Sequence, residues 1–112
     1  ECSDDPWEPN DTRETAAPLQ TETTSGSVCG EDDWFTFGGG TPGTARVLTL
    51  DFVHENGDLD VRLFQPDMTE LASQGITDQE RIAFTSQAGI YFVRVYGFSG
   101  AVGDYTLRVA NQ

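Results

Sequence analysis

Two acidic clusters near the start of the chain hold the residues best suited to binding a hard metal ion. The first spans residues 7–12 (WEPNDT) and the second spans residues 29–35 (CGEDDWF). Carboxylate and carboxamide oxygens are the ligands that calcium prefers in proteins, where it takes about six to eight of them. The sequence therefore suggests a calcium site. The alternative is that Asn10 and Asp11 cap a helical turn, while Asp32 and Asp33 belong to a solvated loop.

The composition limits the partners that the chain can have. Nineteen acidic residues stand against six basic ones, which gives a formal net charge of −13. This charge argues against nucleic acid and anionic membrane surfaces as partners. The apolar runs are far shorter than the roughly 20 residues that a membrane-spanning helix needs, so we expect no membrane insertion. Because the chain begins at Glu1 without an apolar signal region, we expect a processed product or a piece of a longer protein.

The two cysteines, Cys2 and Cys29, lie one near each acidic cluster. If oxidised, they would close a loop whose entropic contribution to stability is about 3.5 kcal/mol. An even number of cysteines in a small acidic domain favours export from the cell. The alternative of a metal-binding cysteine pair is disfavoured, because His54 is distant and no Cys-x-x-Cys spacing occurs.

The distribution of turn residues and β-rich runs predicts one all-β domain over residues 1–112. Residues 1–28 are polar and contain three prolines, and we expect them to form an acidic arm packed on the domain, with a short helical turn around residues 12–17. Seven short β-rich runs follow, which indicates an antiparallel β-sandwich of jelly-roll-like type. The runs are Trp34–Phe37, Arg46–Val53, Leu59–Phe64, Glu70–Ser73, Arg81–Thr85, Ile90–Tyr96 and Tyr105–Val109.

Period-two alternation assigns the two faces of the later strands. The inward positions are Leu59, Val61, Leu63, Tyr91, Val93, Val95, Tyr105, Leu107 and Val109. The opposite positions carry arginines interleaved with aromatic residues on strands that could be neighbours: Arg62, Phe64, Phe92, Arg94 and Tyr96, with Thr106 and Arg108 on a third strand. Arginine and aromatic side chains are enriched at binding hot spots, so these positions are a candidate binding face. The alternative is ordinary cross-strand pairing on an exposed sheet.

Five sequence elements, taken in order, resemble the bacterial pre-peptidase C-terminal domain. They are residues 8–11 (EPND), the acid-x-Asp-Trp-Phe element of residues 31–35, residues 57–61 (GDLDV), residues 88–95 (AGIYFVRV) and residues 103–107 (GDYTL). The resemblance runs from about residue 4 to residue 109 and extends to the collagen-binding domains of clostridial collagenases. It implies a non-catalytic β-sandwich in a secreted bacterial protein, often placed after a peptidase domain.

The resemblance also implies a set of calcium ligands. Glu8, Asn10 and Asp11 match the Glu-Pro-Asn-Asp segment of that family, and Asp33 matches the acid before the aromatic pair. Asp32, Glu31, backbone carbonyls or water would complete the coordination sphere. Pro6 stands where calcium-binding relatives often have another acid, and Glu31 replaces the first Asp of the usual Asp-x-Asp. A Cys2–Cys29 disulfide that brackets the clusters would hold the arm in place even without a metal ion.

Motifs for catalysis are missing from the sequence. It contains a single histidine, no Gly-x-Ser-x-Gly element, no glycine-rich phosphate loop and no His-Glu-x-x-His element. We therefore expect a non-catalytic module, secreted or at the cell surface, that binds a protein substrate or an extracellular polymer and adjoins another domain of its parent protein. The alternatives are a structural or secretion-aiding spacer, and a carbohydrate-binding module that would use Tyr96 and Phe98.

Overall fold

The computed structural model describes residues 13–19, 23–28, 32–52, 59–72, 79–97 and 103–111. Within these ranges the chain forms a short 3-10 turn, η1 (Arg13–Thr15), and nine strands. The strands are β1 (Ala17–Pro18), β2 (Thr23–Val28), β3 (Asp33–Gly38), β4 (Ala45–Phe52), β5 (Leu59–Phe64), β6 (Glu70–Ala72), β7 (Gln79–Thr85), β8 (Ile90–Gly97) and β9 (Gly103–Asn111).

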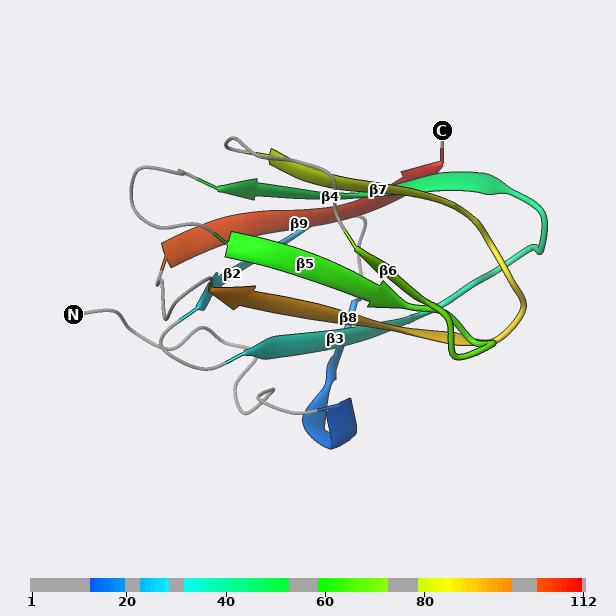
Figure 1. Cartoon of the computed structure of the whole chain (residues 1–112), viewed down its shortest axis with the longest axis horizontal. Coiled ribbons are helices and arrows are strands. Elements are labelled where there is room, and N and C mark those ends of the chain that lie inside the picture. Colours follow the sequence, from blue (N-terminus) through cyan, green and yellow to red (C-terminus); the bar gives the residue numbers. More distant parts are fainter. Residues whose placement is uncertain are drawn as a thin grey trace.

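The strands form two sheets that pack face to face as a β-sandwich (Figure 1). The large sheet has five strands in the order β1-β3-β8-β5-β6, and the small sheet has four in the order β2-β9-β4-β7. Neighbouring strands are antiparallel, except that β1 runs parallel to β3. The fold class predicted from the sequence is confirmed. In the described part of the chain, no helix has the length and apolar character needed to cross a membrane.

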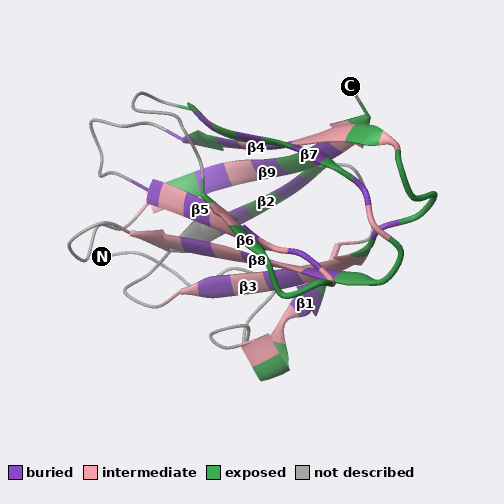
Figure 2. Cartoon of the chain, turned by 45° about the vertical axis from the view of Figure 1, so that its right-hand side comes forward, coloured by how far each residue is buried: buried purple, intermediate pink, exposed green. Residues whose placement is uncertain are grey.

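Buried residues alternate with more exposed ones along the strands, as the colours of Figure 2 show, and the buried hydrophobic residues form one core cluster. The nine positions assigned to the core from the sequence are each at most 6% exposed, which confirms the assignment on β5, β8 and β9. Both layers contribute further core residues: Ala17 on β1, Phe35 on β3, Leu48, Leu50 and Phe52 on β4, and Ile82 and Phe84 on β7. Because side chains of a strand alternate between its two faces, every second residue of these strands remains available to the outside.

Aromatic packing fixes one end of the sandwich. The fully buried ring of Tyr91 stacks on Phe37 with ring centroids 4.9 Å apart, and Phe84 from the small sheet lies 5.3 Å from the same ring. The Tyr91 hydroxyl accepts a hydrogen bond of 2.8 Å from the backbone N–H of Gln87. This buried hydroxyl therefore has a partner, and it ties the turn between β7 and β8 to the core.

The N-terminal third differs from the predicted arm. Residues 23–28 form β2, an edge strand of the small sheet, and Ala17–Pro18 adds a short strand to the large sheet. The helical turn predicted around residues 12–17 corresponds to η1. Several predicted strands extend by one to two residues in the structure, as in β3 and β9, because ladder pairing continues past the residues of high β propensity.

Candidate binding face and cation site

The five residues predicted as a binding face lie together on the outer face of the large sheet, the surface that points away from the small sheet. They come from two neighbouring strands, since β5 pairs with β8 in a register that places Arg62 opposite Arg94 and Phe64 opposite Phe92. All are partly exposed. We call Arg62, Phe64, Phe92, Arg94 and Tyr96 the Arg/aromatic face. The prediction that Thr106 and Arg108 could share this face is wrong, because their strand β9 belongs to the small sheet.

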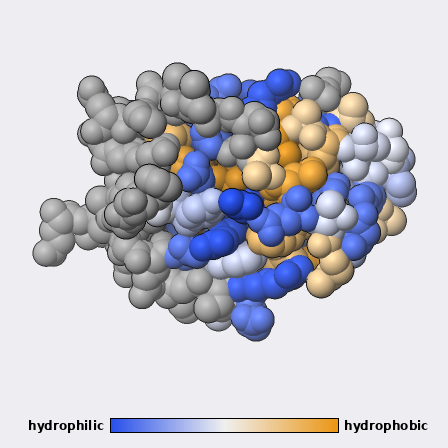
Figure 3. Space-filling view, in the orientation of Figure 1, coloured by the Kyte–Doolittle hydropathy of each residue, from blue (hydrophilic) through white to orange (hydrophobic). Residues whose placement is uncertain are grey.

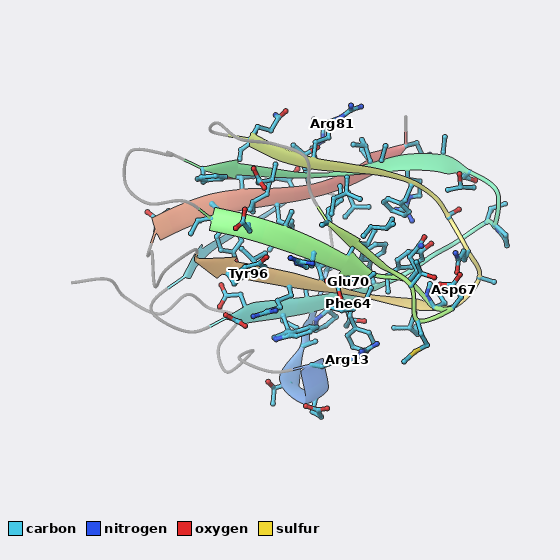
Figure 4. The ribbon with its side chains drawn as sticks, viewed as in Figure 1. Arg13, Phe64, Asp67, Glu70, Arg81 and Tyr96 are labelled. Carbon is cyan, nitrogen blue, oxygen red and sulfur yellow. The ribbon has the colours of Figure 1, made fainter. Side chains whose placement is uncertain are left out.

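An aromatic cluster occupies the side of this face nearest to the N-terminal segment. Trp34 on β3 stacks on Phe64 with ring centroids 5.3 Å apart and an interplanar angle of 27°. The guanidinium of Arg13, from η1, lies 4.4 Å from the ring centroid of Phe92 and 5.6 Å from that of Phe64. Figure 4 shows Arg13 and Phe64 close together below the sheet. These cation–π contacts attach the N-terminal segment to the face, each with roughly 0.5–1 kcal/mol at an exposed site.

A chain of polar contacts crosses the rest of the face. Arg94 donates from Nε to Asp32 Oδ2 at 2.7 Å, and its guanidinium lies 4.4 Å from the Tyr96 ring centroid. The Tyr96 hydroxyl in turn accepts a hydrogen bond of 3.0 Å from Arg62 Nε. Arg62 Nη1 donates to Glu70 Oε2 at 2.6 Å. The hydrogen bond to Tyr96, followed by that to Glu70, raises the pKa of Arg62 above its ordinary value.

These ion pairs contribute orientation more than stability. The side chains of Arg94 and Asp32 are 36% and 35% exposed, and exposed pairs of this kind contribute about 0–1 kcal/mol. The contacts nevertheless hold both arginines in defined positions. The Arg/aromatic face is thus a partly exposed, prearranged mixture of rings and charges. The space-filling view of Figure 3 shows hydrophobic residues in its upper middle, with hydrophilic residues below them.

Asp33 is placed very differently from its neighbour Asp32. It starts β3 on the inward side, is 1% exposed, and accepts a hydrogen bond of 2.6 Å from the Tyr105 hydroxyl of β9. Asp32 instead meets Arg94 on the outer face. The two carboxylates therefore point to opposite sides of the large sheet. A carboxyl group held inside the protein and hydrogen-bonded by a hydroxyl suits one ligand of a cation site, but the pair does not converge on a single ion.

The other predicted site residues lie outside the described residues. This applies to the calcium ligand candidates Glu8, Asn10, Asp11 and Glu31 and to the cysteines Cys2 and Cys29. In the ranges that the structure describes, no group of three or more His, Cys, Asp or Glu side chains is arranged to hold a metal ion. Calcium and the disulfide therefore stay predictions.

Sequence reasoning missed three residues that contact the Arg/aromatic face: Trp34, Glu70 and Arg13. The alternation that places Phe35 inward also places Trp34 outward, but Trp34 was not among the residues assigned to the face. Glu70 lies directly opposite Phe64 across the β5–β6 pair, a register that the sequence does not specify. Arg13 approaches Phe64 and Phe92 from a distant part of the chain, and no local pattern signals such a contact.

Comparisons with known proteins show a likeness in structure. No protein-family model matches the sequence, and no curated protein matches it. The solved pre-peptidase C-terminal domain of the collagenase from Bacillus anthracis superimposes with a TM-score of 0.69 at 20% identity, covering 84% of this chain and 91% of that domain. The resemblance stated from the sequence is therefore confirmed at the level of the fold.

Two further solved structures share the sandwich with lower identity. The surface-associated copper-binding protein CorA of Methylomicrobium album BG8 gives a TM-score of 0.63 at 6% identity, covering 87% of this chain and 98% of that one. PliG of Aeromonas hydrophila, a periplasmic inhibitor of g-type lysozyme, gives a TM-score of 0.59 at 19% identity. The match covers 87% of this chain and 96% of that one. At such identities these likenesses concern the fold.

Proposed function

We propose that this chain is a non-catalytic accessory module of a larger bacterial protein outside the cytoplasm, and that its Arg/aromatic face binds a protein or an extracellular polymer. The observation that carries the proposal is the gathering of rings and guanidinium groups on one partly exposed surface, each held by contacts within the domain. Side chains fixed in advance lose less conformational entropy on binding, and arginine and tyrosine dominate many binding hot spots.

The structural likenesses support the placement outside the cytoplasm. The similar domain of Bacillus anthracis belongs to a collagenase, PliG is described as periplasmic, and the copper-binding protein as surface-associated. A module with the same fold and a net charge of −13 fits such a setting. The absence of a catalytic motif from the sequence supports a binding or spacing role in preference to an enzymatic one.

A structural spacer is the second candidate, and a specific observation favours it. Arg62 and Arg94 already have carboxylate partners within the domain, and Arg13 already covers Phe92. In a spacer, these contacts would serve to fasten the N-terminal segment and to keep the outer face of the large sheet soluble. Its partner would then be a neighbouring domain of the parent protein.

We further propose that calcium stabilises the module at the entrance of β3. Asp33 would supply one ligand, and Glu8, Asn10 and Asp11 the others, with Asp32, Glu31, carbonyls or water completing the shell. The buried carboxyl group of Asp33, hydrogen-bonded to Tyr105, supports this assignment. Because Asp32 already pairs with Arg94, its participation would require that pair to open. A Cys2–Cys29 disulfide would reinforce the same region.

Substitutions in the Arg/aromatic face distinguish between the two candidate functions, a binding module and a structural spacer. We expect the double variant Arg94→Gln, Tyr96→Ala to bind insoluble collagen or peptidoglycan at least about tenfold more weakly, because both hot-spot side chains are lost. Its free energy of unfolding should fall by no more than a few kcal/mol, and circular dichroism should confirm the fold. Co-sedimentation with each polymer measures the binding.

The matched control for this experiment is Arg108→Gln, which removes one guanidinium from the exposed face of β9 on the other sheet. It should leave sedimentation unchanged. Retention of both polymers by the double variant, or equal losses in the control, would contradict the Arg/aromatic face as the binding surface. Failure of the unsubstituted domain to sediment with either polymer would favour the spacer.

Calcium is tested by thermal and urea unfolding of the oxidised domain in EDTA, in calcium and in magnesium at equal ionic strength. At a hundredfold excess over its dissociation constant, calcium should raise the free energy of unfolding by about 2.7 kcal/mol, because it binds the folded state. Asp11→Ala and Asp33→Ala should abolish the rise. The control Asp67→Ala removes an exposed carboxylate at the other end of the sandwich and should retain it (Figure 4). Equal responses to calcium and magnesium would contradict a selective site.

A further inference from the structure

A pocket is lined by residues of the β3–β4 connection, the start of β4 and the end of β9. The β3–β4 connection lies at the right-hand end of the sandwich in Figure 1. The pocket has a volume of about 260 Å³ and is lined by residues 38–41, Thr44, Arg46 and Asn111. Its lining contains one cationic group, hydroxyl and carboxamide groups and glycine backbone, and it includes no acidic or aromatic side chain. None of these residues belongs to the Arg/aromatic face.

Arg46 is the unusual member of the pocket. Its position on β4 has the same parity as the buried Leu48 and Leu50, so its side chain starts on the inward face. The guanidinium lies over the rings of the buried Phe84 and the partly buried Phe37, at 6.0 and 5.5 Å from their centroids. These cation–π contacts hold the guanidinium at this end of the sandwich.

The hydrogen bonds of Arg46 are incomplete in the described part of the chain. Its Nη1 donates to Gly39 O at 3.3 Å, which is long for such a bond, and its Nε is buried without a hydrogen-bond partner. Arg62 and Arg94, by contrast, each reach a carboxylate at 2.6 and 2.7 Å. A buried donor without a partner costs free energy, and a guanidinium presents several donors in a planar fork. Because Nε is buried, an anionic ligand would meet the Nη end of the Arg46 guanidinium, where the long bond from Nη1 to Gly39 O leaves donor capacity.

The wall of the pocket is held in place before any ligand arrives. Ser86 Oγ donates to Thr41 O at 2.6 Å and accepts from Thr44 N at 3.3 Å. Gly43 N donates to Ser86 O, and Ser86 N donates to Thr44 O, both at 2.9 Å. Asn111 stands directly opposite Arg46 in the β4–β9 register, which brings its carboxamide to the same mouth. A fixed wall lowers the entropic cost of binding.

We propose that this pocket binds a carboxylate group of a peptide, with Arg46 as the anchoring residue and Asn111 as a supporting donor. A carboxylate matches the fork of a guanidinium, and the volume admits one short acidic group rather than a length of polymer. The glycine backbone of residues 38–40 offers main-chain groups for an adjoining peptide unit. An acidic sugar fits less well, because no ring in the lining can stack on a pyranose.

The test follows the backbone amides of residues 38–40 in ¹⁵N-HSQC titrations of the domain. The probes are N-acetyl-Gly-Ala with a free C-terminal carboxylate, the same peptide with an amidated C-terminus, and glucuronate. The free acid should give saturable shifts at these glycines, and the amide should not. Arg46→Gln should weaken the binding by about tenfold or more, and Asn111→Ala by a smaller factor.

Control variants distinguish a specific loss of ligand binding from a failure of the domain to fold. Arg81→Gln removes an exposed guanidinium from the outer side of β7, shown at the top of Figure 4, and should bind the free acid like the parent chain. If Arg46→Gln fails to fold, Arg46→Lys keeps the charge but lacks the fork, and its affinity should still fall. Equal affinity for the free acid in the parent chain and in the folded Arg46 variant would overturn the proposal. Equal shifts with the amide or with glucuronate would also overturn it.

Discussion

Replacing Tyr105 by phenylalanine should lower the free energy of unfolding by about 1–3 kcal/mol, measured by urea denaturation at pH 7. The hydroxyl of Tyr105 donates to Asp33 Oδ2 at 2.6 Å inside the sandwich, where Asp33 is 1% exposed and Tyr105 is 3% exposed. Removing the hydroxyl takes this donor away from a buried carboxylate oxygen, and losing a hydrogen bond to a buried charged group costs free energy. The phenylalanine ring still fills the core, so the loss reports on the hydrogen bond rather than on packing.

Tyr96→Phe is the matched control for this substitution. It removes a hydroxyl that accepts a hydrogen bond from Arg62 on a partly exposed face, where water can replace the lost partner. Its cost should remain below about 1 kcal/mol. A Tyr105→Phe variant as stable as the Tyr96→Phe variant would show that the bond between the two sheets does not hold Asp33 in its buried position.

Gly39→Ala should destabilise the domain by about 3 kcal/mol or more, and this is the second large effect. A Cβ atom at position 39 would lie 1.9 Å from the backbone oxygen of Gln87 and 2.9 Å from Cε1 of Tyr91. Neither neighbour can give way cheaply, because one is backbone and the other is a fully buried ring. The hydrogen bond from Gly39 N to Gly89 O holds the two segments at this close distance.

The adjacent glycine provides a control with the opposite expected sign. A Cβ atom at Gly38 meets nothing within 4 Å, so Gly38→Ala should be neutral or stabilising by up to about 1 kcal/mol, since alanine restricts the unfolded chain. Thermal unfolding of both variants measures the contrast. Equal melting temperatures for the two would contradict the close approach of the β3–β4 connection to the turn before β8.

The parts of the fold that sequence predicts well are those governed by strict alternation. Strands such as Leu59–Phe64 and Ile90–Gly97 bury every second residue, so their core and surface positions could be assigned without coordinates. The strand Thr23–Val28 was missed because its sequence, TTSGSV, consists mostly of small polar residues. Its place at the edge of a sheet depends on ladder hydrogen bonds to β9, and these leave no hydrophobic pattern.

For the candidate sites too, the sequence predicts what depends on alternation within one strand and not what depends on contacts between strands. Placing Arg94 and Tyr96 on one face follows from the period of a single strand, whereas the pairing of Asp32 with Arg94 depends on how two strands meet. Asp32 and Asp33 are indistinguishable by residue type, yet one is half-exposed in an ion pair and the other is buried against Tyr105. Arg46 resembles any polar strand residue until the rings beneath it are seen.

The N-terminal segment supplies one edge strand to each of the two sheets. β1 lies alongside β3 in the large sheet, and β2 lies alongside β9 in the small one. Without them, the backbone donors and acceptors on those borders of β3 and β9 could pair with a strand from another copy of the chain. β1 is only two residues long and ends in Pro18, which has no backbone N–H to offer. The same stretch of chain that carries Arg13 to the aromatic cluster thus also discourages self-association by sheet extension.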